Sequence, residues 1–271
     1  MIIDTHTHIF SEETYNEYFA KAEGKVSKVI TISFALMPQQ ERKMQNYALD
    51  DLLKFAVTKN DLYVVAAVNV EKGIPKQLAE IERLIQDKKV WAIKLVPGYQ
   101  HFYPSDEKIY PVAALAEKYS KPLIFHAGDA YDPEGRALLK YSHPLPIDEL
   151  AIKFPKCKIV IAHFGFPYLM ETAAIVNKNK NVYTDISGTI FESSSEGAAK
   201  QLVDQYVKDL QCVFTYFPDV KKKTMFGTDF EGGPSPLNQV RPYIDLTEVV
   251  FSKDEQERVF SGLAEELFFR A

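Results

Sequence analysis

The chain opens with the stretch MIIDTHTH, residues 1–8, a short apolar strand whose polar end carries two histidines one residue apart. Side chains alternate between the two faces of a strand, so we expect Asp4, His6 and His8 to point to the same side. Imidazoles held in this way are ligands for borderline metals such as zinc. The stretch therefore predicts a buried first strand that brings polar groups to one end of a sheet.

Seven further short apolar runs follow, rich in Val, Ile and Phe and mostly without alternation. This is typical of strands that are covered on both faces. The runs, with the first, are Ile2–Ile3, Val29–Phe34, Leu62–Val70, Val90–Val96, Leu123–Phe125, Lys158–Ala162, Val182–Thr184 and Thr224–Gly227.

Between these runs lie stretches with helical periodicity. We predict helices at Glu12–Ala22, Gln39–Thr58, Pro75–Gln86, Pro111–Tyr119, Ile147–Phe154, Pro167–Asn177 and Glu196–Leu210. Ser11 is a candidate N-cap for the first of these helices, and three of the helices begin at a proline, which is tolerated in a first turn.

Strands that alternate with helices predict right-handed crossovers and a parallel sheet. Eight such units close into a (β/α)8 TIM barrel, and 271 residues suit a single domain over 1–271. A doubly wound open sheet is the alternative, but no GxGxxG turn marks its switch point. We therefore expect the barrel.

Composition excludes several classes of protein. The chain has 32 basic and 37 acidic residues, a net charge of −5, and one short basic cluster at 221–223, so we expect no nucleic-acid partner. Its charge-free apolar stretches stop well short of the ~20 residues that span a bilayer, so we expect no membrane partner. Two cysteines, Cys157 and Cys212, form no disulfide framework, and we expect a cytoplasmic protein with reduced thiols.

Chemically capable residues follow the apolar runs. His126 comes after Leu123–Phe125, His163 after Lys158–Ala162, and Asp229 shortly after Thr224–Gly227. In a parallel barrel the carboxyl ends of all strands meet at one face, where active sites of this fold lie. Imidazoles and a carboxylate at that face predict a site for a divalent metal such as Zn²⁺.

These residues, in this order, resemble the amidohydrolase superfamily of metal-dependent barrels. Within it, Ile93-Lys94-Leu95 and the segment from Pro97 to Asp106 resemble the amidohydrolase-2 branch, which is related to aminocarboxymuconate-semialdehyde decarboxylase. The end of the chain, Gly262 to Phe268, is similar to the last helix of that branch. The resemblance covers nearly the whole chain.

The resemblance implies one divalent ion, Zn²⁺ or alternatively Mn²⁺. Its implied ligands are His6, His8, His126 and Asp229, and its implied catalytic residues are Asp229 and His163. Some relatives bridge two metals with a carboxylated lysine on the fourth strand, which here is Lys94, and this remains the lesser alternative. Metal-free lactonases with a similar set of histidines also exist in the branch.

We expect a hydrolase that cleaves a C–O or C–N bond of a small carboxylated or cyclic substrate with a metal-activated water. Asp229 would accept the proton of the water, His163 would polarise the substrate carbonyl, and Asp4 would orient a ligand imidazole. A non-oxidative decarboxylase of an aromatic or muconate-like acid is the second hypothesis, and a silent binding barrel is the third. The branch also implies a possible homodimer.

Several further residues are weaker candidates. The loop Tyr99–Tyr103 is either an aromatic wall of the site or surface packing, and Arg136 is either a grip for a substrate carboxylate or a surface residue. We expect a structural role for His143 and a salt bridge for Arg241. Glu231 lies at the mouth of the expected site.

Overall fold

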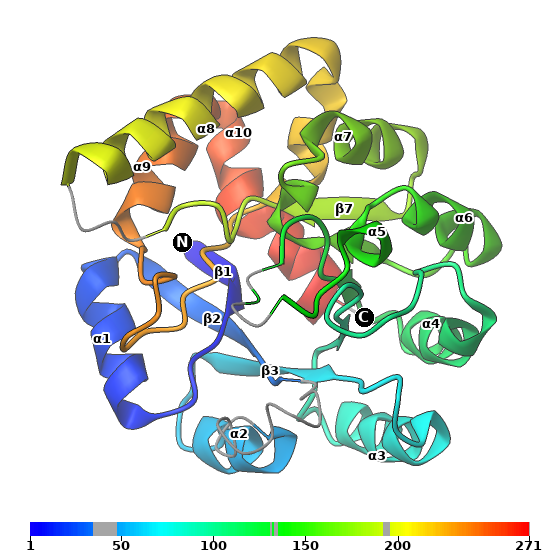
Figure 1. The fold of residues 1–271 in the computed structure, drawn as a ribbon. Helices are drawn as coiled ribbons and strands as arrows, with labels where there is room; N and C mark the ends of the chain where they lie inside the picture. Colours follow the sequence, from blue (N-terminus) through cyan, green and yellow to red (C-terminus); the bar gives the residue numbers. More distant parts are fainter. Residues whose placement is uncertain (35–47, 131, 133–134, 192–195, 271) are drawn as a thin grey trace.

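The computed structural model describes residues 1–34, 48–130, 132, 135–191 and 196–270. Eight parallel strands pair in chain order and form a nearly closed barrel with helices around it (Figure 1). The strands are β1 (Ile2–Thr7), β2 (Val26–Ile32), β3 (Leu62–Ala67), β4 (Ala92–Leu95), β5 (Leu123–Phe125), β6 (Ile159–Ile161), β7 (Val182–Asp185) and β8 (Thr224–Met225). Asp229 N donates to His6 O at 2.7 Å and His8 N donates to Phe230 O at 2.7 Å, which links the last strand to the first. The predicted TIM barrel is confirmed.

The helices lie outside the strands, close to the predicted ranges. They are α1 (Glu12–Ala22), α2 (Leu49–Ala56), α3 (Ile74–Gln86), α4 (Tyr110–Lys118), α5 (Leu139–Ser142), α6 (Pro146–Lys153), α7 (Leu169–Lys178), α8 (Glu196–Tyr216), α9 (Arg241–Val250) and α10 (Lys253–Glu257). Ser11 caps α1 as predicted, since its hydroxyl accepts from Thr14 N. Residues 39–47 of the predicted second helix lie outside the described residues. No helix of the described part of the chain is long and apolar enough to cross a bilayer.

Two apolar clusters divide the core. The larger one joins the outward side chains of the strands to the helices. The smaller one lies inside the barrel and contains Ile3, Ile30, Ile32, Val65, Ala92, Ile124, Val160, Ala162 and Met225, with Leu263, Ala264, Leu267 and Phe268 of the C-terminal segment. Because strand side chains alternate, Lys94, two residues after Ala92, also points into the barrel.

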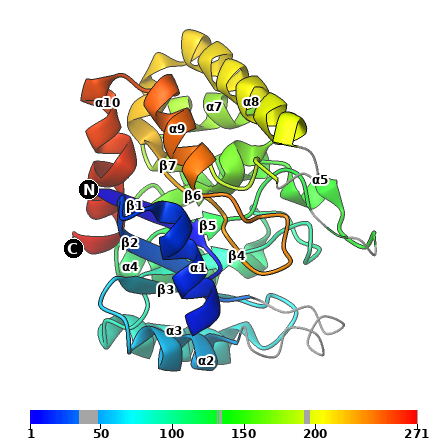
Figure 2. The same ribbon diagram turned by 90° about the vertical axis from the view of Figure 1, so that its left-hand side faces the viewer.

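The C-terminal segment closes the amino-terminal end of the barrel. After α10 the chain continues into two π-helical turns, Arg258–Gly262 and Glu265–Phe269. Figure 2 shows this segment on the same side of the barrel as the N-terminus, opposite the loop that carries α5. The apolar side chains of the segment fill this end, which leaves the opposite mouth for polar groups.

Strand β1 departs from the expected alternation. Its register against β2 shifts between Asp4 and Thr7, so a bulge lies in this stretch. Ile3 and His6 therefore both face the barrel interior, while Asp4 faces outward, where it accepts from Tyr18 Oη of α1 at 2.8 Å. The expectation that Asp4 shares the direction of His6 and His8 is wrong, because the bulge moves the alternation by one residue.

The two cysteines differ in environment. Cys157 is buried and Cys212 is exposed, and neither forms a disulfide. Burial raises the pKa of the Cys157 thiol to about 12. The thiol of Cys157 is therefore a packing group.

Candidate metal centre

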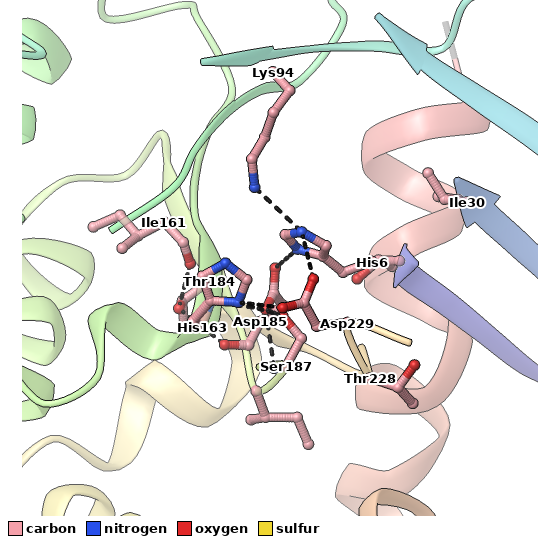
Figure 3. A network of polar contacts seen from close by, with 12 residues as sticks. His6, Ile30, Lys94, Ile161, His163, Thr184, Asp185, Ser187, Thr228 and Asp229 are labelled. Atoms are coloured by element: carbon pink, nitrogen blue, oxygen red, sulfur yellow. Dashed lines mark hydrogen bonds and ion pairs between the residues drawn. The ribbon is translucent and has the colours of Figure 1, made fainter. Parts of the chain in front are cut away.

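Polar side chains from several strands converge at the carboxyl ends of the strands. Five of these side chains form one connected network (Figure 3). They are His6 of β1, Lys94 of β4, His163 after β6, Asp185 at the end of β7 and Asp229 after β8. All five side chains are almost completely buried. The structure thus brings His6, His163 and Asp229 together as the sequence predicted.

His6, His8 and Asp229 form the tightest part of the network. Asp229 Oδ1 lies 3.4 Å from His6 Nε2 and 3.3 Å from His8 Nε2. His8 Nδ1 donates to the Ile32 carbonyl at 3.1 Å, and His6 Nδ1 donates to Asp185 Oδ2 at 3.2 Å. In both of these hydrogen bonds the ring proton lies on Nδ1. A neutral imidazole carries only one such proton, so the Nε2 atom of each ring, which faces Asp229, has a lone pair.

These three acceptor atoms fit a cation. Asp229 Oδ1 is buried and has no hydrogen-bond donor among the described residues, which is costly in a protein interior unless a positive group lies there. The three side chains form one of two groups of potential ligands found among the described residues. Two imidazoles and a carboxylate are a ligand set typical of zinc and of related divalent ions.

The environment keeps Asp229 ionised. Burial by itself raises the pKa of its carboxyl group, but the nearby imidazoles of His163 and His6 outweigh this and hold the pKa well below its usual range. Asp229 also has φ 63°, in the left-handed region, which is uncommon outside glycine but more accessible to Asp than to most residues. Its carboxylate is therefore ionised near neutral pH.

His126 lies beside this group but is not part of it. Its ring centroid is 5.0 Å from that of His163 and 5.0 Å from that of Tyr99. Its Nε2 donates to the Asp129 carbonyl at 3.0 Å, which leaves Nδ1 as the nitrogen with a lone pair. His126 belongs to neither of the two groups of potential ligands in the described residues, and its role as a metal ligand stays a prediction.

His163 reaches the site through an unusual backbone conformation. It has φ 60° and the next residue, Phe164, has φ 48°. Such left-handed residues cost roughly 1–3 kcal/mol each and cluster at functional sites. Burial lowers the pKa of His163 to about 3, so its imidazole is neutral near pH 7. His163 Nδ1 lies 3.9 Å from Asp229 Oδ2.

Gly188 leaves room between these two side chains. It has φ +73°, and a Cβ there would overlap His163 Nδ1 and lie 3.0 Å from Asp229 Oδ2. A side chain at this position would therefore press on both groups. Gly188 is a functional position that the sequence analysis missed.

Asp185 and Ser187 were missed as well. Asp185 Oδ1 accepts from the backbone N of His163 at 3.0 Å, from the backbone N of Ser187 at 3.0 Å, and from the Ser187 hydroxyl. Nearby His6 and its hydrogen bond keep the pKa of Asp185 low, although burial alone would raise it. The signal was present, since Asp185 directly follows the apolar run Val182–Thr184, just as His126 and His163 follow theirs.

Lys94 is the buried cation of the network. Its Nζ donates to His6 Nε2 at 3.2 Å, and burial lowers the pKa of its amine to about 8. The carboxylates of Asp229 and Asp185 act in the opposite direction and favour the charged form. Lys94 thus competes with a metal ion for the lone pair of His6.

The residues of the loop after β4 differ in how close they lie to the network. In the loop after β4, Gln100 and Phe102 are completely buried, and Gln100 Oε1 accepts from Val70 N at 2.9 Å. Tyr99 lies beside His126, whereas Tyr103 is 37% exposed and contacts Tyr141 at 4.7 Å between ring centroids. Only Tyr99 of this loop lies against a predicted site residue in the described structure.

The remaining candidates lie outside the network or at its edge. Arg241 pairs with Asp245 and Glu23, both at 2.8 Å, which confirms the expected salt bridge. His143 packs on Tyr168 at 4.3 Å between ring centroids, as expected of a structural residue. Arg136 lies 4.0 Å from Asp132. Glu231 accepts from Ser235 Oγ at 2.6 Å, and burial raises the pKa of Glu231.

Comparison with protein families gives a match over almost the whole chain. A family model described as amidohydrolase matches residues 3–270. A search of curated proteins gives no significant match.

Solved structures share the fold at low sequence identity. A TIM-barrel protein from Bordetella bronchiseptica has a TM-score of 0.71 and 16% identity, with 98% of this chain and 97% of that chain covered. A candidate 2-pyrone-4,6-dicarboxylic acid hydrolase from Acinetobacter baumannii, with citric acid bound, has a TM-score of 0.64 and 15% identity, with 98% of each chain covered. A 5-carboxyvanillate decarboxylase from Novosphingobium aromaticivorans, in complex with manganese and a nitrobenzoic acid, has a TM-score of 0.65 and 15% identity, with 96% and 80% covered.

Proposed function

The chain belongs to the amidohydrolase family of enzymes, and from this premise we propose that it is a metal-dependent hydrolase of a small carboxylated or cyclic substrate. The bond cleaved is a C–O or C–N bond next to a carbonyl group. One observation carries the proposal: among the described residues Asp229 Oδ1 is buried without a hydrogen-bond donor, and it lies 3.4 Å from His6 Nε2 and 3.3 Å from His8 Nε2. A cation bound among these three atoms makes the arrangement favourable.

His6, His8 and Asp229 would hold the ion, with His126 as the proposed fourth ligand through Nδ1. We expect Zn²⁺, with Mn²⁺ as the alternative. When bound, such an ion lowers the pKa of a coordinated water to about 7–9 and makes hydroxide available near neutral pH. A second ion held by a carboxylated Lys94 is the lesser alternative.

The protein groups around this position have separate tasks. Asp229 stays ionised, so its free oxygen, Oδ2, can accept the proton of the attacking water. His163 faces Oδ2 across the space that Gly188 leaves open, and its neutral ring would lie beside the reacting carbonyl of a bound substrate. Burial of the whole network excludes bulk water and strengthens each electrostatic interaction.

A decarboxylase is the second candidate, and the rings around the site favour it. Phe34 stacks on His8 with 4.5 Å between ring centroids and 15° between planes, and Phe10 stacks on Phe34 at 5.6 Å. Tyr99 lies against His126, with 5.0 Å between ring centroids. Flat aromatic surfaces bind flat conjugated acids well. Release of CO₂ without consumption of water would distinguish this reaction from hydrolysis.

The proposal is tested by metal analysis and metal removal. We expect about one equivalent of divalent metal per chain in the purified protein, since one group of ligands holds it. Chelation should abolish hydrolysis of a panel of lactones and amides of small carboxylic acids, and Zn²⁺ or Mn²⁺ should restore it. Two equivalents that fall to one in Lys94→Gln would support the second ion instead.

His8→Ala and Asp229→Asn should each lose the metal and at least about 100-fold in activity. The matched control is Asp219→Asn, which removes a surface carboxylate that pairs with Lys222 at 2.6 Å. It should keep both metal and activity. Full activity after complete metal removal would overturn the proposal in favour of a metal-free lactonase.

A further inference from the structure

One carboxylate connects two of the imidazoles of the site. Asp185 Oδ2 accepts from His6 Nδ1 at 3.2 Å, while Asp185 Oδ1 accepts from the Ser187 hydroxyl. Ser187 Oγ in turn lies 3.0 Å from His163 Nδ1. The chain of contacts thus runs from His163 through Ser187 and Asp185 to His6, as Figure 3 shows.

The direction of each hydrogen bond in this chain follows from the chemistry of the groups. An ionised carboxylate only accepts, so Ser187 must donate its single hydroxyl proton to Asp185. The Ser187 oxygen is then left as the acceptor for His163 Nδ1, which must carry the ring proton. His163 Nε2 therefore has a lone pair, and among the described residues it has no hydrogen-bond partner.

His6 has the same tautomer for two independent reasons. Its Nδ1 faces the Asp185 carboxylate, which needs a donor, and its Nε2 faces Lys94 Nζ at 3.2 Å, which is itself a donor. The protons of both rings thus lie on Nδ1.

We infer that Asp185 and Ser187 are positioning residues that set His6 and His163 in the Nδ1–H tautomer. His6 then offers Nε2 to a metal, and His163 presents an unprotonated Nε2 to the site. The role of His163 in this inference rests on the proposed hydrolase. It differs from the role first expected, because a ring with a lone pair on Nε2 cannot donate to a substrate carbonyl.

The segment that carries these two residues is held rigidly. Asp185 and Ser187 are almost completely buried, and the backbone N of Ser187 donates to Asp185 Oδ1 at 3.0 Å. The backbone N of His163 donates to the same oxygen at 3.0 Å. Asp185 therefore holds both the backbone of His163 and, through Ser187, its side chain.

Nitrogen NMR of the protein labelled with ¹⁵N-histidine measures the tautomers directly. We expect Nδ1 protonated and Nε2 unprotonated for His6 and His163, both in chelator-treated protein and in protein loaded with Zn²⁺. Ser187→Ala should remove this preference from His163 and leave His6 unchanged. The matched control is Thr184→Val, which removes another buried hydroxyl of β7, one that donates to the Ile161 carbonyl at 2.7 Å, and should leave both rings unchanged.

The affinity for Zn²⁺, measured by competition with a chelator, is the second measurement. Asp185→Asn should weaken it by about 10–100-fold, because the amide can donate to His6 Nδ1 and move the ring proton to Nε2. Ser187→Ala should change it by no more than about threefold, because His163 is not among the four proposed ligands.

A protonated Nε2 on His163 of the unmodified protein overturns the inference, and this result needs no variant. A spectrum of Ser187→Ala in which the tautomer of His163 is unchanged also overturns the inference. If the protein binds no Zn²⁺ and hydrolyses nothing, the proposed function fails, while the tautomers of the metal-free protein still decide the role of Asp185 and Ser187.

Discussion

At the scale of single residues, the site depends on side chains and backbones that are costly in isolation. His163 and Asp229 both lie in the left-handed region of φ, and Asp229 Oδ1 is buried without a donor. Each of these features is unfavourable unless the surrounding structure or a bound cation compensates for it. They coincide at the position where Gly188 leaves a space.

Gly188→Ala tests whether this space is required. The added Cβ would overlap His163 Nδ1 and lie 3.0 Å from Asp229 Oδ2, so we expect a loss of at least about 100-fold in kcat. Gly24→Ala is the matched control, because Gly24 has almost the same φ, +72° against +73°, but nothing within 4 Å of its Cβ position. Both variants should lose about 1–3 kcal/mol of unfolding free energy from backbone strain, and only Gly188→Ala should lose activity. Equal activity in the two variants would show that the space beside Gly188 is not required for catalysis.

At the scale of elements, the bulge in β1 determines which side chains enter the barrel. It directs His6 inward and turns Asp4 toward α1 and β8. Asp4 accepts from Tyr18 Oη at 2.8 Å, from Thr228 Oγ1 at 2.7 Å, and from the backbone N of Thr228 and of His6, both at 3.1 Å. Asp4 therefore fastens the first strand to the segment that follows β8, next to the residues of the proposed metal site.

Tyr18→Phe removes one of these bonds and should lower the unfolding free energy by about 1–2 kcal/mol. Burial raises the pKa of Asp4 to about 7, although its hydrogen bonds lower it. Asp4 is thus protonated in the folded protein at pH 5.5 and ionised at pH 8.5, and a phenol bonds more strongly to a carboxylate than to a carboxylic acid. The loss should therefore be larger at pH 8.5.

Urea unfolding at the two pH values measures this difference. Tyr15→Phe is the control, since it removes a hydroxyl that donates to Asp61 at 2.8–2.9 Å in a less buried place. Its cost should be smaller than that of Tyr18→Phe. An equal cost of Tyr18→Phe at both pH values would show that Asp4 does not change its charge in this range.

At the scale of the whole molecule, the barrel has one apolar end and one polar end. Leu263, Leu267 and Phe268 of the C-terminal segment pack against the inward side chains of the strands. The polar network occupies the opposite mouth and joins residues as distant in the sequence as His6 and Asp229. The stability of the apolar end and the geometry of the site are thus separate properties of one barrel.

Phe268→Ala should lower the unfolding free energy by about 3–5 kcal/mol, because it leaves a cavity in the apolar end. Phe268 is completely buried. Val249→Ala is the control, because Val249 is 63% exposed, and it should change stability by no more than about 0.5 kcal/mol. Denaturant unfolding measures both, and a Phe268→Ala cost below about 1 kcal/mol would contradict the packing role. The metal content of folded Phe268→Ala should be unchanged.

The amino-acid sequence by itself determined the class of fold and most of the members of the site. Eight apolar runs separated by helical stretches predict a parallel barrel, and a parallel barrel brings the residues after its strands to one face, which is why His6, His8, His163 and Asp229 could be named. Only the tertiary structure decided how these groups are oriented. Four features of the site depend on contacts that only the folded chain makes. They are the bulge that turns Asp4 away, the left-handed turn at His163, the carbonyl that accepts from His126, and the contacts of Asp185 and Ser187. Strand alternation describes the direction of a side chain only while the backbone is regular, and at this site the backbone is irregular.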